Sequence, residues 1–203
     1  MTAIVDYGVG NLFSLRSSLA AIGEEAEVTG DARRIAAADR VILPGVGAFA
    51  DARRKLAGTG MDSAVLDAAE SGKPLLGICL GMQLLFERSH EYGEHAGLGL
   101  LRGEVVGMAG RIPAGLPIPH IGWNALDILR PGGILKYVKG GDCVYFVHSY
   151  CAVGCDESLT ATAEYGMAVT AAVSLGNVHG CQFHPEKSGR VGLSILRAFC
   201  ELR

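Results

Sequence analysis

Short apolar runs alternate with segments of helical spacing in the first half of the chain. The runs predict buried strands at residues 2–7, 25–29, 40–43 and 75–78. Between them, apolar residues recur on one helical face from Leu12 to Ile22 and again from Met61 to Ala68. Strands that alternate with helices favour a parallel sheet that is covered on both faces.

The second half is richer in strands. The pattern weakens from His90 to Pro119, where one strand is predicted near residues 104–108. Five further strands are predicted, at residues 123–129, 143–150, 158–165, 168–174 and 177–183. A last helix is expected from about Ser188. Without a repeat or linker, the sequence predicts one α/β domain over residues 1–203, with a central, mostly parallel but mixed sheet and helices on both faces.

Charge and composition narrow the function classes. The formal net charge is −3 with both signs scattered, so we expect no nucleic-acid partner. No apolar run approaches a membrane span and no secretory signal is visible, so we expect no membrane contact. Six cysteines without a C-x-x-C pair indicate a reducing, cytoplasmic setting. Because Cys151 and Cys155 lack a second ligand pair at usable spacing, we expect no metal site. We also expect no cofactor.

Cys79 ends an apolar strand between two glycines, Gly77 and Gly81. A sharp strand-to-helix turn lifts its central side chain out of the sheet, and flanking glycines let backbone and substrate come close. The pattern predicts a nucleophile elbow with Cys in place of Ser, followed by a helix that starts over residues 82–86. Free cysteines are also among the most buried residues, so the motif alone leaves a core position open.

His184 is the candidate base for this nucleophile. At an unperturbed pKa of about 8.5, only a few per cent of a cysteine is thiolate at neutral pH, so a base is needed. His184 ends an apolar strand, and in an extended segment residues i and i+2 point the same way, so Glu186 can reach its ring. An isolated H-x-E segment is often an incidental surface pair. Together with an elbow cysteine it favours a triad of nucleophile, base and orienting carboxylate.

A glycine-rich loop follows the strand at residues 40–43. Residues 45–50 match G-x-G-x-x-A, with Asp67 and Glu70 about twenty residues on, as in dinucleotide-binding proteins. That fingerprint belongs to the first strand-helix turn, whereas this loop is a later one. The other use of such a loop is to direct backbone N–H groups at a developing negative charge, where each donor is worth about 3 kcal/mol.

Two other histidines lie in patterned segments. His120 precedes the only Trp of the chain in residues 119–124, and His148 ends an aromatic-rich strand. Composition alone favours core strands with satisfied polar ends at both places.

Five motifs carry a resemblance to a known family. PGVGAF, GICLGMQLLF, PHIGWN, YFVHSY and QFHPEKS occur in this order along the chain. With them the chain resembles the class I, or triad, glutamine amidotransferases, and within that family the glutaminase subunits of imidazole glycerol phosphate synthases. The elbow and HPE are typical of the whole family, whereas PHIGWN, FVHSY and Lys187-Ser188 are typical of these subunits. Ile121 stands where Met is commoner in the family.

The resemblance implies hydrolysis of the γ-amide of L-glutamine to glutamate and ammonia. It implies that Cys79 attacks the amide carbon, that His184 carries the thiol proton to departing ammonia, and that Glu186 holds the ring. The implied oxyanion hole uses backbone N–H groups of Leu80 and of Val46 or Gly47. The implied glutamine pocket consists of Gly45, Gly47, Gln83, Glu91, His148, Ser149 and Tyr150.

The resemblance also implies a partner, because free ammonia is quickly protonated in water and loses its nucleophilic lone pair. The expected partner is a (β/α)8-barrel cyclase subunit, which makes imidazole glycerol phosphate and the aminoimidazole carboxamide ribonucleotide, in a heterodimer. The residues implied to face it are Asn11, Trp123, Tyr145 and Lys187. Three alternatives stay open: a triad glutaminase of another synthase, such as pyridoxal phosphate or anthranilate synthesis, an inactive binding module, and a peptidase or chaperone relative with an elbow cysteine.

Overall fold

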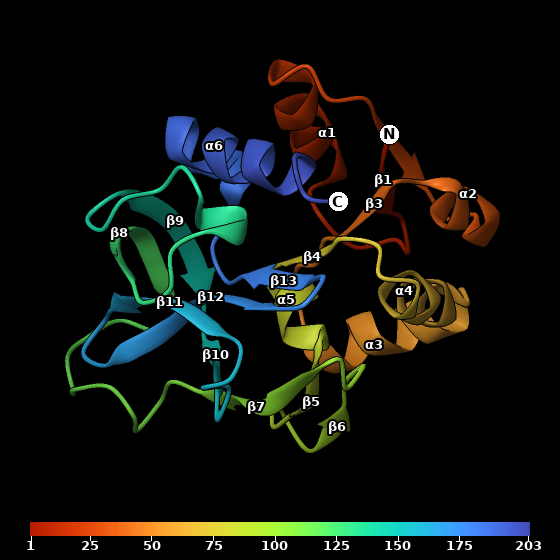
Figure 1. Cartoon of the computed structure of the whole chain (residues 1–203). Coiled ribbons are helices and arrows are strands. Elements are labelled where there is room, and N and C mark those ends of the chain that lie inside the picture. The colour runs from red at the N-terminus through yellow and green to blue at the C-terminus, as the bar shows by residue number, and fades with distance from the viewer.

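A nine-stranded sheet forms the centre of the computed structural model, which describes residues 1–203 (Figure 1). Its strands are β1 (Thr2–Val5), β2 (Ala26–Thr29), β3 (Arg40–Leu43), β4 (Leu75–Ile78), β8 (His120–Ile128), β9 (Cys143–His148), β11 (Leu159–Glu164), β12 (Ala168–Leu175) and β13 (Val178–Cys181). They lie in the order β2-β1-β3-β4-β13-β12-β11-β8-β9. The first five pair in parallel and the remaining pairs are antiparallel. The predicted mixed sheet of an α/β fold is confirmed, with parallel and antiparallel halves of equal size.

Six α-helices cover or border this sheet. They are α1 (Leu12–Ala21), α2 (Ala32–Ala37), α3 (Phe49–Gly58), α4 (Met61–Glu70), α5 (Leu80–Leu84) and α6 (Gly189–Cys200). Two of them, α2 and α3, are absent from the elements predicted by sequence. The helix α2 has only six residues, and in α3 the buried positions Phe49, Ala52 and Leu56 stand among charged neighbours.

Alternation along the strands decides which helices cover which face. Val5 and Leu43 lie in one apolar cluster with residues of α3 and α4. Their strand neighbours Ile4 and Ile42 point to the other face and lie in a second cluster with residues of α1 and α6. Figure 1 shows α1 and α6 on one side of the sheet and α3 and α4 on the other. Helices on both faces are therefore confirmed.

A second, four-stranded sheet is a feature that the sequence pattern does not predict. It contains β5 (Phe86–Ser89), β6 (His95–Ala96), β7 (Leu101–Gly107) and β10 (Tyr150–Val153), in the order β10-β7-β5-β6. The helix predicted over residues 82–86 ends at Leu84, because Phe86 is fully buried and pairs with Leu101. The prediction of a helix at Phe86 is therefore wrong.

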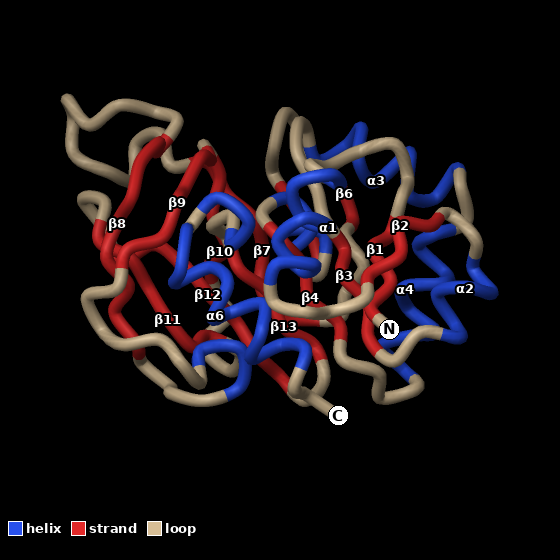
Figure 2. Tube along the Cα trace, turned by 90° about the horizontal axis from the view of Figure 1, so that it is seen from above, coloured by secondary structure: helices blue, strands red, loops and turns tan.

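The strand predicted over residues 143–150 is two strands in two sheets. The chain leaves β9 after His148 and enters β10 at Tyr150, so Ser149 is the link between the sheets. Figure 2 shows β1, β2 and β3 near α2 and α4 at one end of the molecule and β8, β9 and β11 at the other. None of the helices combines the length and apolar character needed to cross a lipid bilayer.

Candidate active site

Cys79 occupies the sharp turn between β4 and α5. Its backbone has φ 55° and ψ −113°, and only Tyr92 among the other non-glycine residues has a positive φ. Such a conformation costs about 1–3 kcal/mol and persists only where the surroundings enforce it. A Cβ on Gly81 would overlap the carbonyl oxygen of Leu43, and one on Gly77 would lie 2.7 Å from the carbonyl oxygen of Gly81. The glycines on both sides of Cys79 are thus required by close packing of the turn.

Parallel pairing of β4 with β13 brings the two halves of the site together. Ile78 lies opposite Cys181, and the amide of Cys79 donates to the carbonyl of Cys181 at 2.8 Å. The residues that follow each strand therefore emerge side by side at the carboxyl edge of the sheet. On β4 this residue is Cys79, and after β13 the chain continues through Gln182 to His184.

His184 and Glu186 form a buried pair beside the cysteine. The Nδ1 of His184 and Oε1 of Glu186 are 2.8 Å apart, and both side chains are 3% exposed. The contact agrees with the expectation from sequence, but its geometry differs: residues 185–187 form a 3-10 helix, so the chain is extended only as far as His184. The His184 amide donates to the carbonyl of Tyr145, and the Ser188 hydroxyl donates to the His184 carbonyl.

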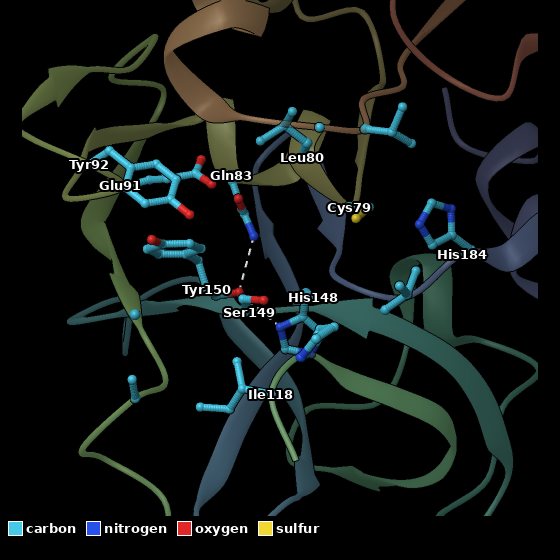
Figure 3. Close-up of a pocket in the computed structure, with 16 residues that line it drawn as sticks. Cys79, Leu80, Gln83, Glu91, Tyr92, Ile118, His148, Ser149, Tyr150 and His184 are labelled. Carbon is cyan, nitrogen blue, oxygen red and sulfur yellow. Dashed lines mark hydrogen bonds between the residues drawn. The ribbon is translucent and has the colours of Figure 1, made fainter.

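The surroundings of His184 favour its protonated form. Burial alone lowers the pKa of this ring, but hydrogen bonds with Cys79 and Glu186 and their negative charges outweigh burial and raise the pKa to about 9. Since Nδ1 donates to Glu186, Nε2 is the nitrogen left for the thiol. Figure 3 shows the Cys79 sulfur beside the His184 ring. The ring can therefore take up a proton from the thiol.

A cavity of about 530 Å³ opens above this cluster (Figure 3). The predicted site residues that line it are Val46, Gly47, Cys79, Leu80, Gln83, Glu91, His148, Ser149, Tyr150 and His184. Gly45 does not line it. A Cβ at Gly45 would lie 2.7 Å from the Gly81 amide nitrogen, so this glycine packs against the elbow rather than facing the cavity.

A helix N-terminus and a glycine-rich loop both border the cavity. Because α5 begins at Leu80, its first N–H groups have no acceptor within the helix and carry the positive end of its dipole. Val46 and Gly47 form the facing wall, and Gly47 has a φ of 92°, which favours glycine. The site thus combines a helix N-terminus with a glycine-rich loop, as an anionic intermediate requires.

Two polar side chains border the far end of the cavity. The Nε2 of Gln83 donates to the Tyr150 carbonyl at 3.1 Å and to Oε1 of Gln182 at 2.9 Å, so only its Oε1 remains for a ligand. The carboxylate of Glu91 accepts from the amide of Phe49, the first residue of α3. This contact also satisfies a helix N-terminus whose own N-cap, Ala48, has no side-chain acceptor.

A histidine pair supports the wall formed by residues 148–150. Nδ1 of His148 lies 2.8 Å from the Tyr150 carbonyl, and its Nε2 lies 3.1 Å from Nδ1 of His120. Burial lowers the pKa of His148 to about 4, although the bond to the carbonyl opposes this. His120, which the sequence left as a core position, is fully buried and stacks on Phe146 and Tyr165.

Gln182 is a site residue that sequence reasoning missed. It is fully buried, and its Nε2 lies 3.7 Å from the Cys79 sulfur. The available signal was its position two residues before His184, since alternate residues of an extended segment share a side.

The residues predicted to face a partner do not all lie together. The Trp123 and Tyr145 rings are 4.9 Å apart on paired strands, and the Lys187 ammonium lies 5.5 Å from the centre of the Tyr145 ring. The Trp123 side chain is 64% exposed. Asn11 instead lines a small cavity next to His184 and Glu186.

Comparisons with known proteins agree with this geometry. The family model described as glutamine amidotransferase class-I matches residues 3–201. The imidazole glycerol phosphate synthase subunit HisH of Moorella thermoacetica is 51% identical over 201 residues, 98% of this chain and 94% of that protein. The subunit of the same name from Caldanaerobacter subterraneus is 50% identical over 203 residues, 100% of this chain and 98% of that protein.

Solved structures share the fold at low identity. A crystal structure described as a glutamine amidotransferase has a TM-score of 0.76 at 21% identity and covers 98% of this chain and 97% of its own. The structure of PurLQS from Thermotoga maritima has a TM-score of 0.75 at 22% identity and covers 98% and 96%.

Proposed function

The chain belongs to the class-I glutamine amidotransferase family, and on this premise we propose that it is the glutaminase subunit of an imidazole glycerol phosphate synthase. The observation that carries the proposal is the position of Cys79, on a strained elbow beside the buried His184–Glu186 pair and at the floor of the cavity. Its reaction is the hydrolysis of L-glutamine to glutamate and ammonia, which a synthase subunit uses in histidine biosynthesis.

The first half of the reaction is attack by sulfur. His184 takes the thiol proton, the Cys79 sulfur bonds to the γ-amide carbon, and the carbonyl oxygen becomes an oxyanion. The Leu80 amide and an N–H of the facing Val46–Gly47 wall donate to this oxygen. Glu186 keeps Nδ1 protonated, so that Nε2 is the nitrogen that exchanges the proton with the reacting groups.

The second half releases both products. His184 returns its proton to the amide nitrogen, the C–N bond breaks, and ammonia leaves a γ-glutamyl thioester on Cys79. Water then attacks the thioester carbon while His184 accepts one of its protons. When the C–S bond breaks, the electron pair returns to sulfur, glutamate leaves, and His184 protonates the thiolate again.

Charge and hydrogen bonding at the far end of the cavity suit the amino-acid end of glutamine. The Glu91 carboxylate attracts the α-ammonium group, and the free Oε1 of Gln83 accepts a further N–H. Ser149, Tyr150 and His148 provide the opposite wall, where backbone groups hold the α-carboxylate. Both ends of the substrate are then fixed while its γ-carbon lies above sulfur.

The ammonia passes to a cyclase subunit. The related proteins are named as subunits of a synthase, which requires a second subunit to consume the product. We propose that this subunit is a (β/α)8 barrel, that it covers the cluster of Trp123, Tyr145 and Lys187, and that it also reaches Asn11 at the small cavity beside His184 and Glu186. An exposed Trp whose ring packs against a Tyr is of the composition that interface centres prefer.

Glutamate release from glutamine, measured with and without the cyclase subunit, tests the proposed function. Cys79→Ala should abolish the partner-stimulated activity, because alanine has no thiol that could form the thioester. Cys143→Ala, at an exposed cysteine outside the cavity, is the matched control and should retain activity. Full activity of Cys79→Ala would overturn the mechanism, and stimulation only by a different synthase would overturn the choice of partner.

A further inference from the structure

Gln182 has no part in the reaction described above, yet its amide lies against the reacting sulfur. The residue follows β13 and is fully buried. We propose that Gln182 is a further catalytic residue, whose side-chain N–H donates to the Cys79 sulfur whenever that sulfur carries negative charge. The inference deepens the proposed function and rests on it for the identity of the reaction.

A directed chain of hydrogen bonds fixes which end of the Gln182 amide faces sulfur. The amide nitrogen of Gln83 has two N–H groups and no acceptor capacity, and it donates both, to the Tyr150 carbonyl and to Oε1 of Gln182. Oxygen therefore occupies the Gln83 side of Gln182, and its Nε2 faces Cys79 at 3.7 Å. A flipped amide would place two donors against each other and a carbonyl oxygen against the thiolate.

Strand pairing holds the side-chain amide of Gln182 beside Cys79. Ile78 and Cys181 are opposite each other in paired parallel strands, so Cys79 and Gln182 are the next pair along. The backbone N–H of Gln182 donates to the Ala171 carbonyl of β12 at 2.9 Å, which ties the residue to the sheet on its other side. The donor is therefore positioned by sheet pairing rather than by a mobile loop.

The side-chain amide of Gln182 can donate to sulfur at every step of the reaction, whereas His184 cannot. His184 gives up its proton to the leaving ammonia and later takes one from water, so its charge changes during the cycle. The Gln182 amide does not titrate, and its N–H is available at every step. It stabilises the attacking thiolate and, more importantly, the thiolate that leaves when the thioester is hydrolysed, because hydrogen bonds to a charged acceptor are stronger than those to a neutral one.

Alkylation of Cys79 at different pH values tests the contact without glutamine or a partner. The full-length chain is treated with iodoacetamide, and mass spectrometry follows the peptide that contains Cys79, which separates it from the other cysteines. In Gln182→Met, which keeps the volume but removes both polar ends, we expect the midpoint of the pH–rate profile to rise by roughly one pH unit, the effect of losing one donor to an anion. Identical profiles for Gln182→Met and the parent chain would overturn the proposal.

Thr170→Val is the matched control. Thr170 is a buried polar residue of β12, the strand next to β13, and its hydroxyl donates to the Ala152 carbonyl at 2.8 Å. Its loss removes a buried hydrogen bond from the same sheet, so thermal melting should shift for both variants. The profile of Cys79 should move only in Gln182→Met. If both profiles move together, a general loosening of the sheet explains the result and Gln182 has no specific role.

A second variant covers the case in which Gln182→Met does not fold. Gln182→Asn keeps an amide but is one methylene shorter, so it cannot span both Gln83 and Cys79, and its profile midpoint should also rise. With the cyclase subunit and glutamine, either variant should hold a larger steady-state fraction of γ-glutamyl thioester, seen by intact mass after acid quench. No thioester and no glutamate from the parent chain would defeat the proposed function, while the alkylation result would still decide the Gln182 contact.

Discussion

The Cys79 sulfur lies in a cluster of three polar side chains. His184 supplies a titratable partner with a pKa near 9, Glu186 holds that ring from behind, and Gln182 presents a donor that does not titrate. The Oε2 of Glu186 is buried without a hydrogen-bond partner, which costs free energy in the folded state.

Removing the charge of Glu186 separates its effect on the pKa of His184 from its hydrogen bond with Nδ1. Glu186→Gln keeps an acceptor for Nδ1 but removes the negative charge that raises the pKa of His184, so we expect that pKa to fall. The kcat of partner-stimulated glutaminase should fall about 100-fold to 10,000-fold, the range for loss of general base catalysis. Steady-state kinetics and an NMR titration of the His184 ring measure both quantities. An unchanged kcat with a lowered His184 pKa would contradict the role of the carboxylate.

At the scale of elements, the elbow is a junction of β3, β4 and α5 with no spare volume. A Cβ at Gly81 would meet the carbonyl of Leu43, and one at Gly45 would meet the amide of Gly81. The turn between β4 and α5 is held on one side by the end of β3 and on the other by β13. Its strained backbone is thus enforced by packing between elements, and the first N–H groups of α5 are placed by the same contacts.

A single methyl group at this junction should be costly. Gly81→Ala must push α5 away from β3, and we expect a loss of about 2–4 kcal/mol in the free energy of unfolding, together with loss of glutaminase activity. Gly58→Ala, at the end of α3 where no atom lies within 4 Å of the added Cβ, should be neutral or stabilise the chain by about 0.5–1 kcal/mol. Urea unfolding of both variants measures this, and equal stability of the two would refute the packing argument.

At the scale of the whole molecule, buried histidines link stability to pH. Burial lowers the pKa of His148 and of His179 to about 4. Between pH 6.5 and 4 the unfolded chain binds protons at these rings while the folded chain does not, so stability falls as the pH falls. His184 acts in the opposite sense. Its raised pKa contributes stability that is complete below about pH 6.5 and is lost as the pH rises through 9.

A variant of His179, which lies outside the cavity, tests how much of the loss of stability at acid pH comes from a buried histidine. The pKa of His179 is 6.5 in the unfolded chain and about 4 in the folded chain. At 1.36 kcal/mol for each pH unit, this difference corresponds to about 3 kcal/mol in the free energy of unfolding. His179→Gln keeps a partner for the Ser174 hydroxyl but cannot be protonated. Urea unfolding at pH 7 and pH 4.5 covers about two of these pH units, so the loss of stability should be smaller by about 2.5 kcal/mol in the variant. The same loss in both chains would show that His179 contributes nothing to it.

The exposed aromatic cluster concerns the whole molecule because it is proposed to meet another one. Trp123 is 64% exposed, so Trp123→Ala should leave the melting temperature almost unchanged. Affinity for the cyclase subunit should fall at least about 30-fold, the effect expected for a central interface Trp. Isothermal titration of the two subunits measures it. The Tyr137→Ala variant, at a half-exposed tyrosine that bonds to Glu201, is the control and should bind normally.

The sequence by itself determined the strands β1 to β4 as buried strands of a parallel sheet, the elbow, and the contact between His184 and Glu186. Each depends on neighbours within a few residues: apolar runs, glycines around one cysteine, and two side chains two positions apart. Motifs and their order then indicated the family, which the comparisons show.

Only the tertiary structure decided which distant segments meet. The pairing of β4 with β13 places Cys79 beside Gln182 and His184, and no local pattern specifies that two strands a hundred residues apart are neighbours. The second sheet, the change of sheet at Ser149 and the end of α5 before Phe86 have the same origin, since strand pairing and burial override local helical spacing. The residue types of the site could be read from the sequence, whereas their relative positions depend on contacts between segments that are distant in the chain.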